Sequence, residues 1–179
     1  MEFHRSPKKF RCIIGGWGCG KTTAGVLEAI NLSLRYPGNF GLIARADTKR
    51  LMMTTLAELF NYLPKELILE HNKREQMITL INGSQIAYMG IAEEYDARDK
   101  IQSMNLGWFY IDQAEEISED MFLLLKGRLR RQNTSRQGYL TANAAGKNWI
   151  YKRFVEMDVP EYEKENYAVW IIKSFENIY

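Results

Sequence analysis

A segment of eight residues limits the possible folds of this sequence more than any other. Gly15-Gly16-Trp17-Gly18-Cys19-Gly20-Lys21-Thr22 fits the pattern G-x-x-x-x-G-K-[ST] at every fixed position. An apolar run at residues 10–14 precedes it, and residues 21–36 after it have the apolar spacing of a helix. A glycine-rich loop between a buried strand and a helix predicts an α/β fold. In such a fold, backbone N–H groups and the start of the helix face an anion.

The residue types of this loop predict which anion it binds. Glycines let the backbone curl so that successive N–H groups point at phosphate oxygens. Lys21 then reaches the β- and γ-phosphates of ATP, and the hydroxyl of Thr22 binds Mg²⁺. We therefore expect ATP and Mg²⁺ as cofactors, held by the set that begins at Gly15 and ends at Thr23. The alternative is a glycine-rich turn followed by a surface lysine.

Further apolar runs predict the other strands, at residues 40–44, 106–111, 139–142 and 167–172. Residues 77–81 and 84–89 flank Asn82-Gly83, a strong signal for a hairpin turn. Strands that alternate with helices predict a mainly parallel sheet flanked by helices, with this antiparallel hairpin added. The expected fold class is therefore α/β, a P-loop NTPase domain of the ASCE or RecA-like type.

Apolar periodicity also predicts the helices that cover this sheet. Asp47 suits the N-cap of a helix that stops before Pro64, and another helix begins at Ser118. The helix at 21–36 is expected to pack one apolar face on the sheet, formed by Val26, Leu27, Ile30 and Leu34.

Composition narrows the class of protein. The chain has 179 residues without repeats or linker-like tracts, which fits a single domain. No apolar run approaches the roughly 20 residues of a membrane helix. Two cysteines form no disulfide framework and suit a reducing cytosol. Residues 121–155 hold eight Lys or Arg and no acid. This stretch is either a positive field for phosphates or a solvated basic face.

A second motif lies where the apolar run 106–111 ends in Asp112. A carboxylate at the end of a neighbouring strand holds Mg²⁺ in P-loop enzymes, so Asp112 is the predicted metal residue. Many such ATPases place a catalytic glutamate next, but this chain has Gln113, with Glu115 and Glu116 beyond it. Either Glu115 or Glu116 activates the water, or Gln113 has replaced the glutamate and turnover is slow. In an extended chain Glu115 points to the same side as Gln113, which favours it over Glu116. Both glutamates also suit the start of a helix.

The order of these motifs resembles the N-terminal ATPase domain of the large subunit of tailed-phage terminases. The resemblance includes the glycine-rich loop and six further segments: Asn82-Gly83-Ser84-Gln85-Ile86, Lys100-Ile101-Gln102-Ser103, Tyr110-Ile111-Asp112-Gln113-Ala114-Glu115-Glu116-Ile117, Gly127-Arg128-Leu129-Arg130, Thr141-Ala142-Asn143 and Ser174-Phe175-Glu176-Asn177.

This resemblance implies an ATP-driven motor that packages double-stranded viral DNA into a procapsid. It implies a portal protein and a small terminase subunit as partners, a homo-oligomeric ring, no membrane, and the cytoplasm of the infected host cell. Thr141 and Asn143 would belong to the coupling motif that senses the γ-phosphate. Arg128 or Arg130 would reach the ATP of a neighbouring subunit. Because the family's C-terminal nuclease does not fit in 179 residues, we expect residues 1–179 to be one ATPase domain of a longer protein.

Two departures from the family pattern keep alternatives open. Many relatives have a basic residue inside the loop where this chain has Trp17, so a finger from that loop is not expected. The predicted catalytic set is Lys21, Asp112, Glu115, Glu116 and Arg128, with Gln113 unsettled. A helicase-like DNA-dependent ATPase shares the same motifs. A nucleotide-binding assembly module with little turnover is the third hypothesis, which Gln113 motivates.

Overall fold

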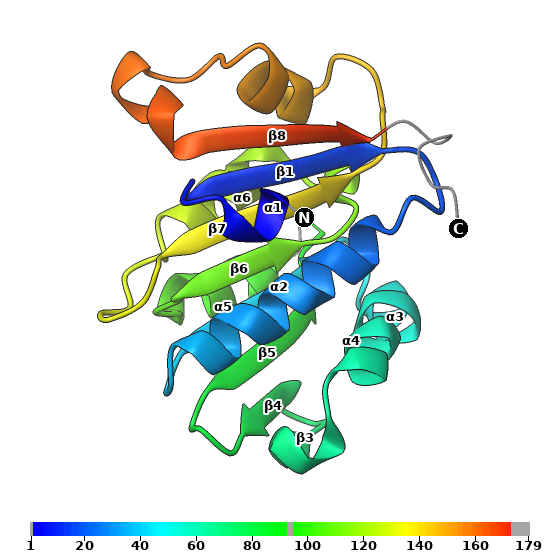
Figure 1. Cartoon of the computed structure of the whole chain (residues 1–179), viewed down its shortest axis with the longest axis vertical. Helices are drawn as coiled ribbons and strands as arrows, with labels where there is room; N and C mark the ends of the chain where they lie inside the picture. The colour runs from blue at the N-terminus through cyan, green and yellow to red at the C-terminus, as the bar shows by residue number, and fades with distance from the viewer. Residues whose placement is uncertain (1, 93–94, 173–179) are drawn as a thin grey trace.

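One eight-stranded sheet organises the chain (Figure 1). The structure, a computed structural model, describes residues 2–92 and 95–172. The strand order is β3-β4-β5-β2-β6-β7-β1-β8. All neighbours are parallel except β3–β4 and β4–β5, which are antiparallel. The strands are β1 (Phe10–Gly15), β2 (Phe40–Arg45), β3 (Ile68–Asn72), β4 (Met77–Leu80), β5 (Gln85–Gly90), β6 (Trp108–Ile111), β7 (Gln137–Ala142) and β8 (Tyr167–Ile172). The predicted mainly parallel sheet with an added hairpin is confirmed.

Helices cover both faces of this sheet (Figure 1). One face carries α1 (Glu2–Arg5), α2 (Lys21–Arg35), α3 (Thr48–Leu51) and α4 (Ala57–Tyr62). A π-helical turn, Met52–Leu56, joins α3 to α4. The other face carries α5 (Tyr95–Ser103) and α6 (Glu119–Lys126). Further helical turns lie at Lys65–Leu67, Ala114–Glu116, Tyr151–Val155 and Glu161–Asn166. No helix in the described ranges is long and apolar enough to cross a membrane.

Each face of the sheet has its own apolar core, because side chains alternate along the strands. On β6, Trp108 and Tyr110 pack with α2, while Phe109 packs with α6. Tyr110 stacks on Tyr139 of β7, with ring centroids 5.0 Å apart and planes 9° from parallel. These large buried rings fix β6 and β7 side by side, so their carboxyl ends meet at one edge of the sheet.

The packing face of α2 differs from the predicted one. Val26 and Ile30 are buried as expected, but Leu27 and Leu34 are each 38% exposed. Small residues face the sheet instead, because a Cβ at Gly25 would lie only 2.4 Å from the hydroxyl oxygen of Tyr110. The ring of Tyr110 requires glycine at position 25, and the buried face of α2 excludes Leu27 and Leu34, so the expectation for these two leucines was wrong.

The predicted helix N-cap and the predicted hairpin turn are confirmed. Asp47 caps α3, since its Oδ1 accepts a hydrogen bond from the backbone N of Arg50 at 2.7 Å. Gly83 has φ of 79° in the turn between β4 and β5, a conformation that favours glycine. The edge strand β3 was not predicted. The segment Ser174-Phe175-Glu176-Asn177 lies outside the described residues.

Candidate functional site

The glycine-rich loop runs from the end of β1 to the start of α2, as predicted. Gly18 and Gly20 have φ of 72° and 75°, which glycine adopts without strain. A Cβ at Gly15 would lie 2.9 Å from the carbonyl oxygen of Ile172, so β8 closes one side of the loop. The Lys21 ammonium donates to the carbonyl of Gly15 at 2.9 Å and to that of Gly16 at 2.6 Å. Its charge therefore lies inside the curve of the loop.

Asp112 follows β6 at the same edge of the sheet and is 3% exposed. Hydroxyl groups from two different elements donate to its carboxylate. Thr141 of β7 donates to Oδ1 at 2.6 Å, and Thr55 of the π-helical turn donates to Oδ2 at 2.5 Å. The backbone N of Gln113 also donates to Oδ1 at 3.1 Å. Asp112 is thus held in one orientation from several sides.

Thr22 and Asp112, the two predicted metal residues, face each other. The Thr22 hydroxyl oxygen lies 3.4 and 3.5 Å from the two carboxylate oxygens. Among the described residues, no group of three or more His, Cys, Asp or Glu side chains is arranged to hold a metal. One carboxylate and one hydroxyl fit Mg²⁺, which binds through few protein ligands and takes the rest from water and phosphate oxygens. The residues present therefore fit the expected ion.

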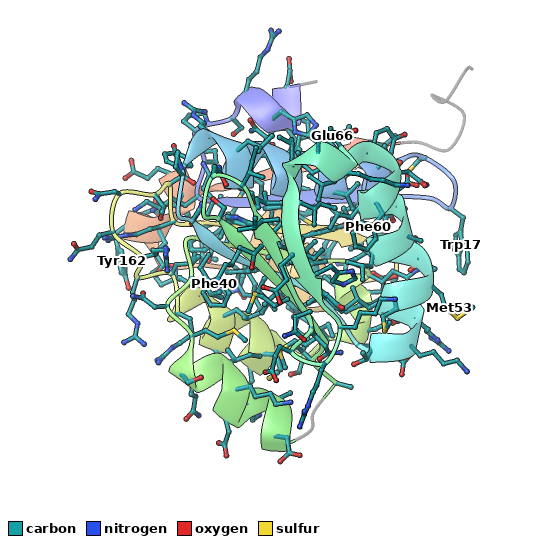
Figure 2. All side chains as sticks on the ribbon, turned by 90° about the horizontal axis from the view of Figure 1, so that it is seen from below. Trp17, Phe40, Met53, Phe60, Glu66 and Tyr162 are labelled. Atoms are coloured by element: carbon teal, nitrogen blue, oxygen red, sulfur yellow. The ribbon has the colours of Figure 1, made fainter. Side chains whose placement is uncertain are left out.

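A pocket of about 310 Å³ lies over the loop. Its lining is Trp17, Gly18, Cys19, Gly20, Lys21, Thr22, Thr23, Asp112, Gln113 and Asn143. Trp17 is 85% exposed and projects outward on the same side as Met53 (Figure 2). Asp112 and Gln113 line this pocket, but Glu115 and Glu116 do not.

The two glutamates turn to opposite sides because the chain bends after Asp112. Gln113 adopts a left-handed conformation, with φ of 51°, and Ala114–Glu116 forms a tight helical turn. Glu115 accepts hydrogen bonds from the backbone N and the side-chain amide of Asn143. Glu116 lies 3.6 Å from the guanidinium of Arg50. The assumption of an extended chain, which favoured Glu115, is therefore wrong.

Thr141 of the predicted coupling motif belongs to a buried chain of hydroxyl groups. Tyr110 is fully buried, and burial, with a further contribution from the charge of Asp112, raises the pKa of its hydroxyl well above the ordinary value. The protonated Tyr110 hydroxyl lies 3.0 Å from the Thr141 hydroxyl. A carboxylate only accepts, so Thr141 donates to Asp112 and accepts from Tyr110. The sheet core thereby orients the carboxylate at its edge.

The sequence reasoning missed three side chains from β2 and the helical segment that follows it. Arg45, at the end of β2, is 6% exposed and donates to Gln113 and Thr54. Thr55 holds Asp112, and Glu58 of α4 accepts from Thr23 at 2.5 Å. Arg45 ends an apolar strand, as Asp112 does, and that pattern was a usable signal. Thr55 and Glu58 follow no motif.

Arg128 lies at the opposite edge of the sheet from the loop. Its carbonyl accepts from the backbone N of Leu106, which precedes β6, whereas Asp112 follows β6. The Arg128 guanidinium donates to the carbonyl of Gln102 at 2.9 Å. The structure therefore does not bring Arg128 to the pocket of its own chain. Its role at a neighbouring subunit's site stays a prediction.

A family comparison covers most of the chain. The family model described as phage terminase large subunit matches residues 7–177. The chain belongs to the phage terminase large-subunit family. The expected family membership is confirmed. A comparison with curated proteins gave no match.

Solved terminase structures share the fold at low sequence identity. The large terminase of a thermophilic bacteriophage has a TM-score of 0.77 and 14% identity, over 92% of this chain and 40% of that chain. The same protein in complex with ADP has a TM-score of 0.75 and 14% identity, over 93% and 40%. The large terminase ATPase domain of Thermus phage P74-26 has a TM-score of 0.72 and 15% identity, over 96% and 78%. The terminase chain described here thus spans about two-fifths of the first of these proteins.

Proposed function

We propose that this chain hydrolyses ATP with Mg²⁺ and that the hydrolysis drives packaging of double-stranded viral DNA into a procapsid. The observation that supports it best is the pairing of Thr22 with Asp112 across a pocket that also contains the Lys21 ammonium. A hydroxyl, a carboxylate and an ammonium in this order suit Mg²⁺ and the terminal phosphates of a nucleotide. Family membership supports the packaging role.

Each residue of the pocket then has a chemical role. The backbone N–H groups of the loop bind phosphate oxygens, and Lys21 neutralises charge between the β- and γ-phosphates. Thr22 and Asp112 hold Mg²⁺, which supplies further charge neutralisation at the phosphates when bound. Thr55 and Thr141 keep the Asp112 carboxylate turned toward Thr22. Preorganised groups of this kind stabilise the transferring phosphoryl group.

Coupling to DNA is assigned to Thr141 and Asn143. Asn143 lines the nucleotide pocket and also holds Glu115, so it touches both the ATP site and the segment that leads to α6. Activation of the water by Glu115 or Glu116 stays a prediction. The proposed partners are double-stranded DNA, a portal protein, a small terminase subunit and further copies of this chain in a ring. They would meet in the cytoplasm of the infected host cell.

Relatives support the nucleotide part of this proposal. The large terminase of the thermophilic bacteriophage has been solved with ADP and with ATP-γ-S, and its fold is shared over 93% and 96% of this chain. The glycine-rich loop and Asp112 would bind each of these nucleotides through the phosphate groups that the nucleotides have in common.

The test measures phosphate release from ATP by the purified chain across a range of Mg²⁺ concentrations, with and without double-stranded DNA. We expect Mg²⁺-dependent turnover that Lys21→Ala lowers by about 10² to 10³, because one charged donor to the phosphates is lost. Asp112→Ala should still bind ATP but no longer respond to Mg²⁺. Lys164→Ala, on the remote Glu161–Asn166 turn, is the matched control. Equal turnover in Lys21→Ala and the control would overturn the proposal.

A further inference from the structure

Gln113 stands where a catalytic glutamate is expected, yet its side chain is held in the nucleotide pocket. We propose that Gln113, fixed by Arg45, is the residue that positions the attacking water at the γ-phosphate. This inference rests on the proposed ATPase function. It assigns the water-positioning step to an amide rather than to Glu115 or Glu116.

Placement is the first argument for Gln113. It directly follows Asp112 and lines the same pocket as Lys21 and Thr22. Glu115 is turned to Asn143 and Glu116 to Arg50, and neither lines that pocket. A group that positions the water must reach the γ-phosphate side of the metal residue. Glu116 lines the adjoining pocket together with Thr22 and Gln113, but its carboxylate is paired with Arg50. Of the residues that follow Asp112 in this turn, Gln113 lines both pockets.

Backbone conformation is the second argument. Gln113 has φ of 51° and ψ of 54°, a left-handed conformation that is uncommon for any residue other than glycine, asparagine or aspartate. Such a conformation persists where surrounding contacts hold it. Here the contacts are the Gln113 backbone N on Asp112 Oδ1, at 3.1 Å, and the side chain on Arg45.

The contact with Arg45 fixes which way the amide points. A guanidinium has donors and no acceptor, so the Gln113 atom that meets Arg45 Nη2 must be the carbonyl oxygen Oε1. Among the described residues, Nε2 makes no hydrogen bond. The two N–H groups of Nε2 and the second lone pair of Oε1 therefore stay available. An amide held in this way offers a donor to a phosphate oxygen and an acceptor to a water proton.

Arg45 is itself immobilised, so it is able to hold Gln113. Its side chain is buried, and Nη1 donates to the hydroxyl of Thr54 at 2.7 Å. The Thr54 hydroxyl in turn donates to the carbonyl of Arg50 at 2.8 Å. Glu116 lies 4.0 Å from Arg45 Nε and 3.6 Å from Arg50. Thr54 and Arg50 belong to the helical segment after β2, and Glu116 belongs to the turn after β6. Held from both segments, Arg45 is a positioning residue that acts through Gln113.

The chemistry needs no proton acceptor with a shifted pKa. The water oxygen forms a bond to the γ-phosphorus as the bond from that phosphorus to the β–γ bridging oxygen breaks. ADP leaves with that oxygen, and the water proton passes to the phosphate product. Since the transition state of phosphoryl transfer is loose, orientation of the water and charge stabilisation supply most of the catalysis. A glutamine performs this task in other P-loop NTPases.

The test compares Gln113→Met, which keeps the length but removes both hydrogen-bonding groups, with Gln76→Met. Gln76 also has a left-handed φ, of 52°, but lies in the turn between β3 and β4. We expect Gln113→Met to lower the single-turnover rate of MgATP hydrolysis about 10²-fold or more, because a positioned group near the reacting atoms contributes at least that much. Its affinity for ATP-γ-S should not change. Gln76→Met should hydrolyse at the unmodified rate.

A double-mutant cycle then tests Arg45. Arg45→Lys keeps the charge but loses the planar fork, and should lower the rate in the native background. It should have no further effect in Gln113→Met, because Arg45 acts through Gln113.

A normal rate in Gln113→Met, with Lys21→Ala inactive, overturns this inference and leaves the ATPase proposal standing. Loss of activity in Glu115→Gln alone would assign the step to Glu115. Normal rates in both Gln113→Met and Lys21→Ala would remove the ATPase proposal as well.

Discussion

Asn143 donates two hydrogen bonds to the carboxylate of Glu115, one from its backbone N at 3.0 Å and one from its side-chain amide. Asn143 follows β7 and Glu115 follows β6, so these bonds join two neighbouring strand ends. Asn143 also lines the nucleotide pocket. We propose that a change at the γ-phosphate passes through this link to the turn that leads into α6.

From this link we predict that Asn143→Ala separates hydrolysis from its response to DNA. The variant loses the side-chain bond to Glu115, so MgATP binding should persist while stimulation of turnover by double-stranded DNA disappears. The measurement is the ratio of phosphate release with and without DNA. Asn105→Ala, at an exposed position before β6, is the control. A normal ratio in Asn143→Ala would assign coupling to other residues.

Thr55→Val should weaken both stability and metal binding. Thr55 is fully buried and donates to a carboxylate, so removal of its hydroxyl lowers the free energy of unfolding by about 1.5 to 3 kcal/mol. The less constrained Asp112 should also need more Mg²⁺ for half-maximal turnover. Urea denaturation and an Mg²⁺ titration measure the two effects. Thr55→Ser, which keeps the hydroxyl, should restore the Mg²⁺ response; failure to do so would indicate a packing effect.

The resemblance to terminases predicts that Arg128 acts on the ATP of a neighbouring subunit, and the structure places it at the edge of the sheet remote from its own pocket. A guanidinium supplied by a neighbour accelerates turnover by about 10³ to 10⁵. The experiment mixes Arg128→Ala subunits with Lys21→Ala subunits, and each kind alone is expected to hydrolyse ATP far more slowly than the unmodified chain. Recovered hydrolysis supports action between subunits. If mixed assemblies form without activity, Arg128 has a DNA-binding or structural role, and Arg130 is tested in the same way.

Stability in acid should depend on Glu28, which is buried on α2 beside Arg11 of β1, 2.7 Å away. Burial alone raises the pKa of Glu28, but hydrogen bonds and charge from His4 and Arg11 outweigh it and hold the pKa below its ordinary 4.5. The ionised form is therefore favoured by folding. Its contribution is complete above pH 4.5 and is lost as the pH falls through the lower pKa of the folded state.

Glu28→Gln tests this linkage. It leaves the buried Arg11 without its ionic partner, so the free energy of unfolding at neutral pH should fall by about 3 to 5 kcal/mol. The difference between the two proteins should shrink as the pH is lowered below 4.5. Chemical denaturation across the acidic range measures it. A difference independent of pH would show that the ionic pairing does not contribute.

The sheet was predictable because its signals are local. Each predicted strand is a short apolar run, and the turn at Asn82-Gly83 is specified by two adjacent residues. The edge strand β3 was missed because three of its five residues, Ile68–Asn72, are polar and its sequence has no alternation. Periodicity also selected Leu27 and Leu34 on α2, whereas both are 38% exposed and Tyr110 requires glycine at position 25 of that interface.

The site residues that belong to short sequence motifs were predictable. Lys21 and Thr22 are adjacent, and Asp112 ends an apolar run. Thr55 was not predictable, since it reaches Asp112 from 57 positions away through a π-helical turn. The different directions of Glu115 and Glu116 depend on the left-handed Gln113, and an extended-chain argument has no means to foresee that bend.

The exposed indole of Trp17 gives the protein an optical reporter of its own. Of the four tryptophans, Trp108 is fully buried, and Trp149 and Trp170 are partly buried, whereas Trp17 is 85% exposed at the pocket rim. Its fluorescence should therefore dominate the long-wavelength side of the emission spectrum. A nucleotide that fills the pocket displaces water from one side of this ring, so the emission changes without any attached dye. Nucleotide binding can then be followed in a stopped-flow instrument on the unlabelled chain. Trp17→Phe is the control, because its remaining tryptophans lie away from the pocket rim.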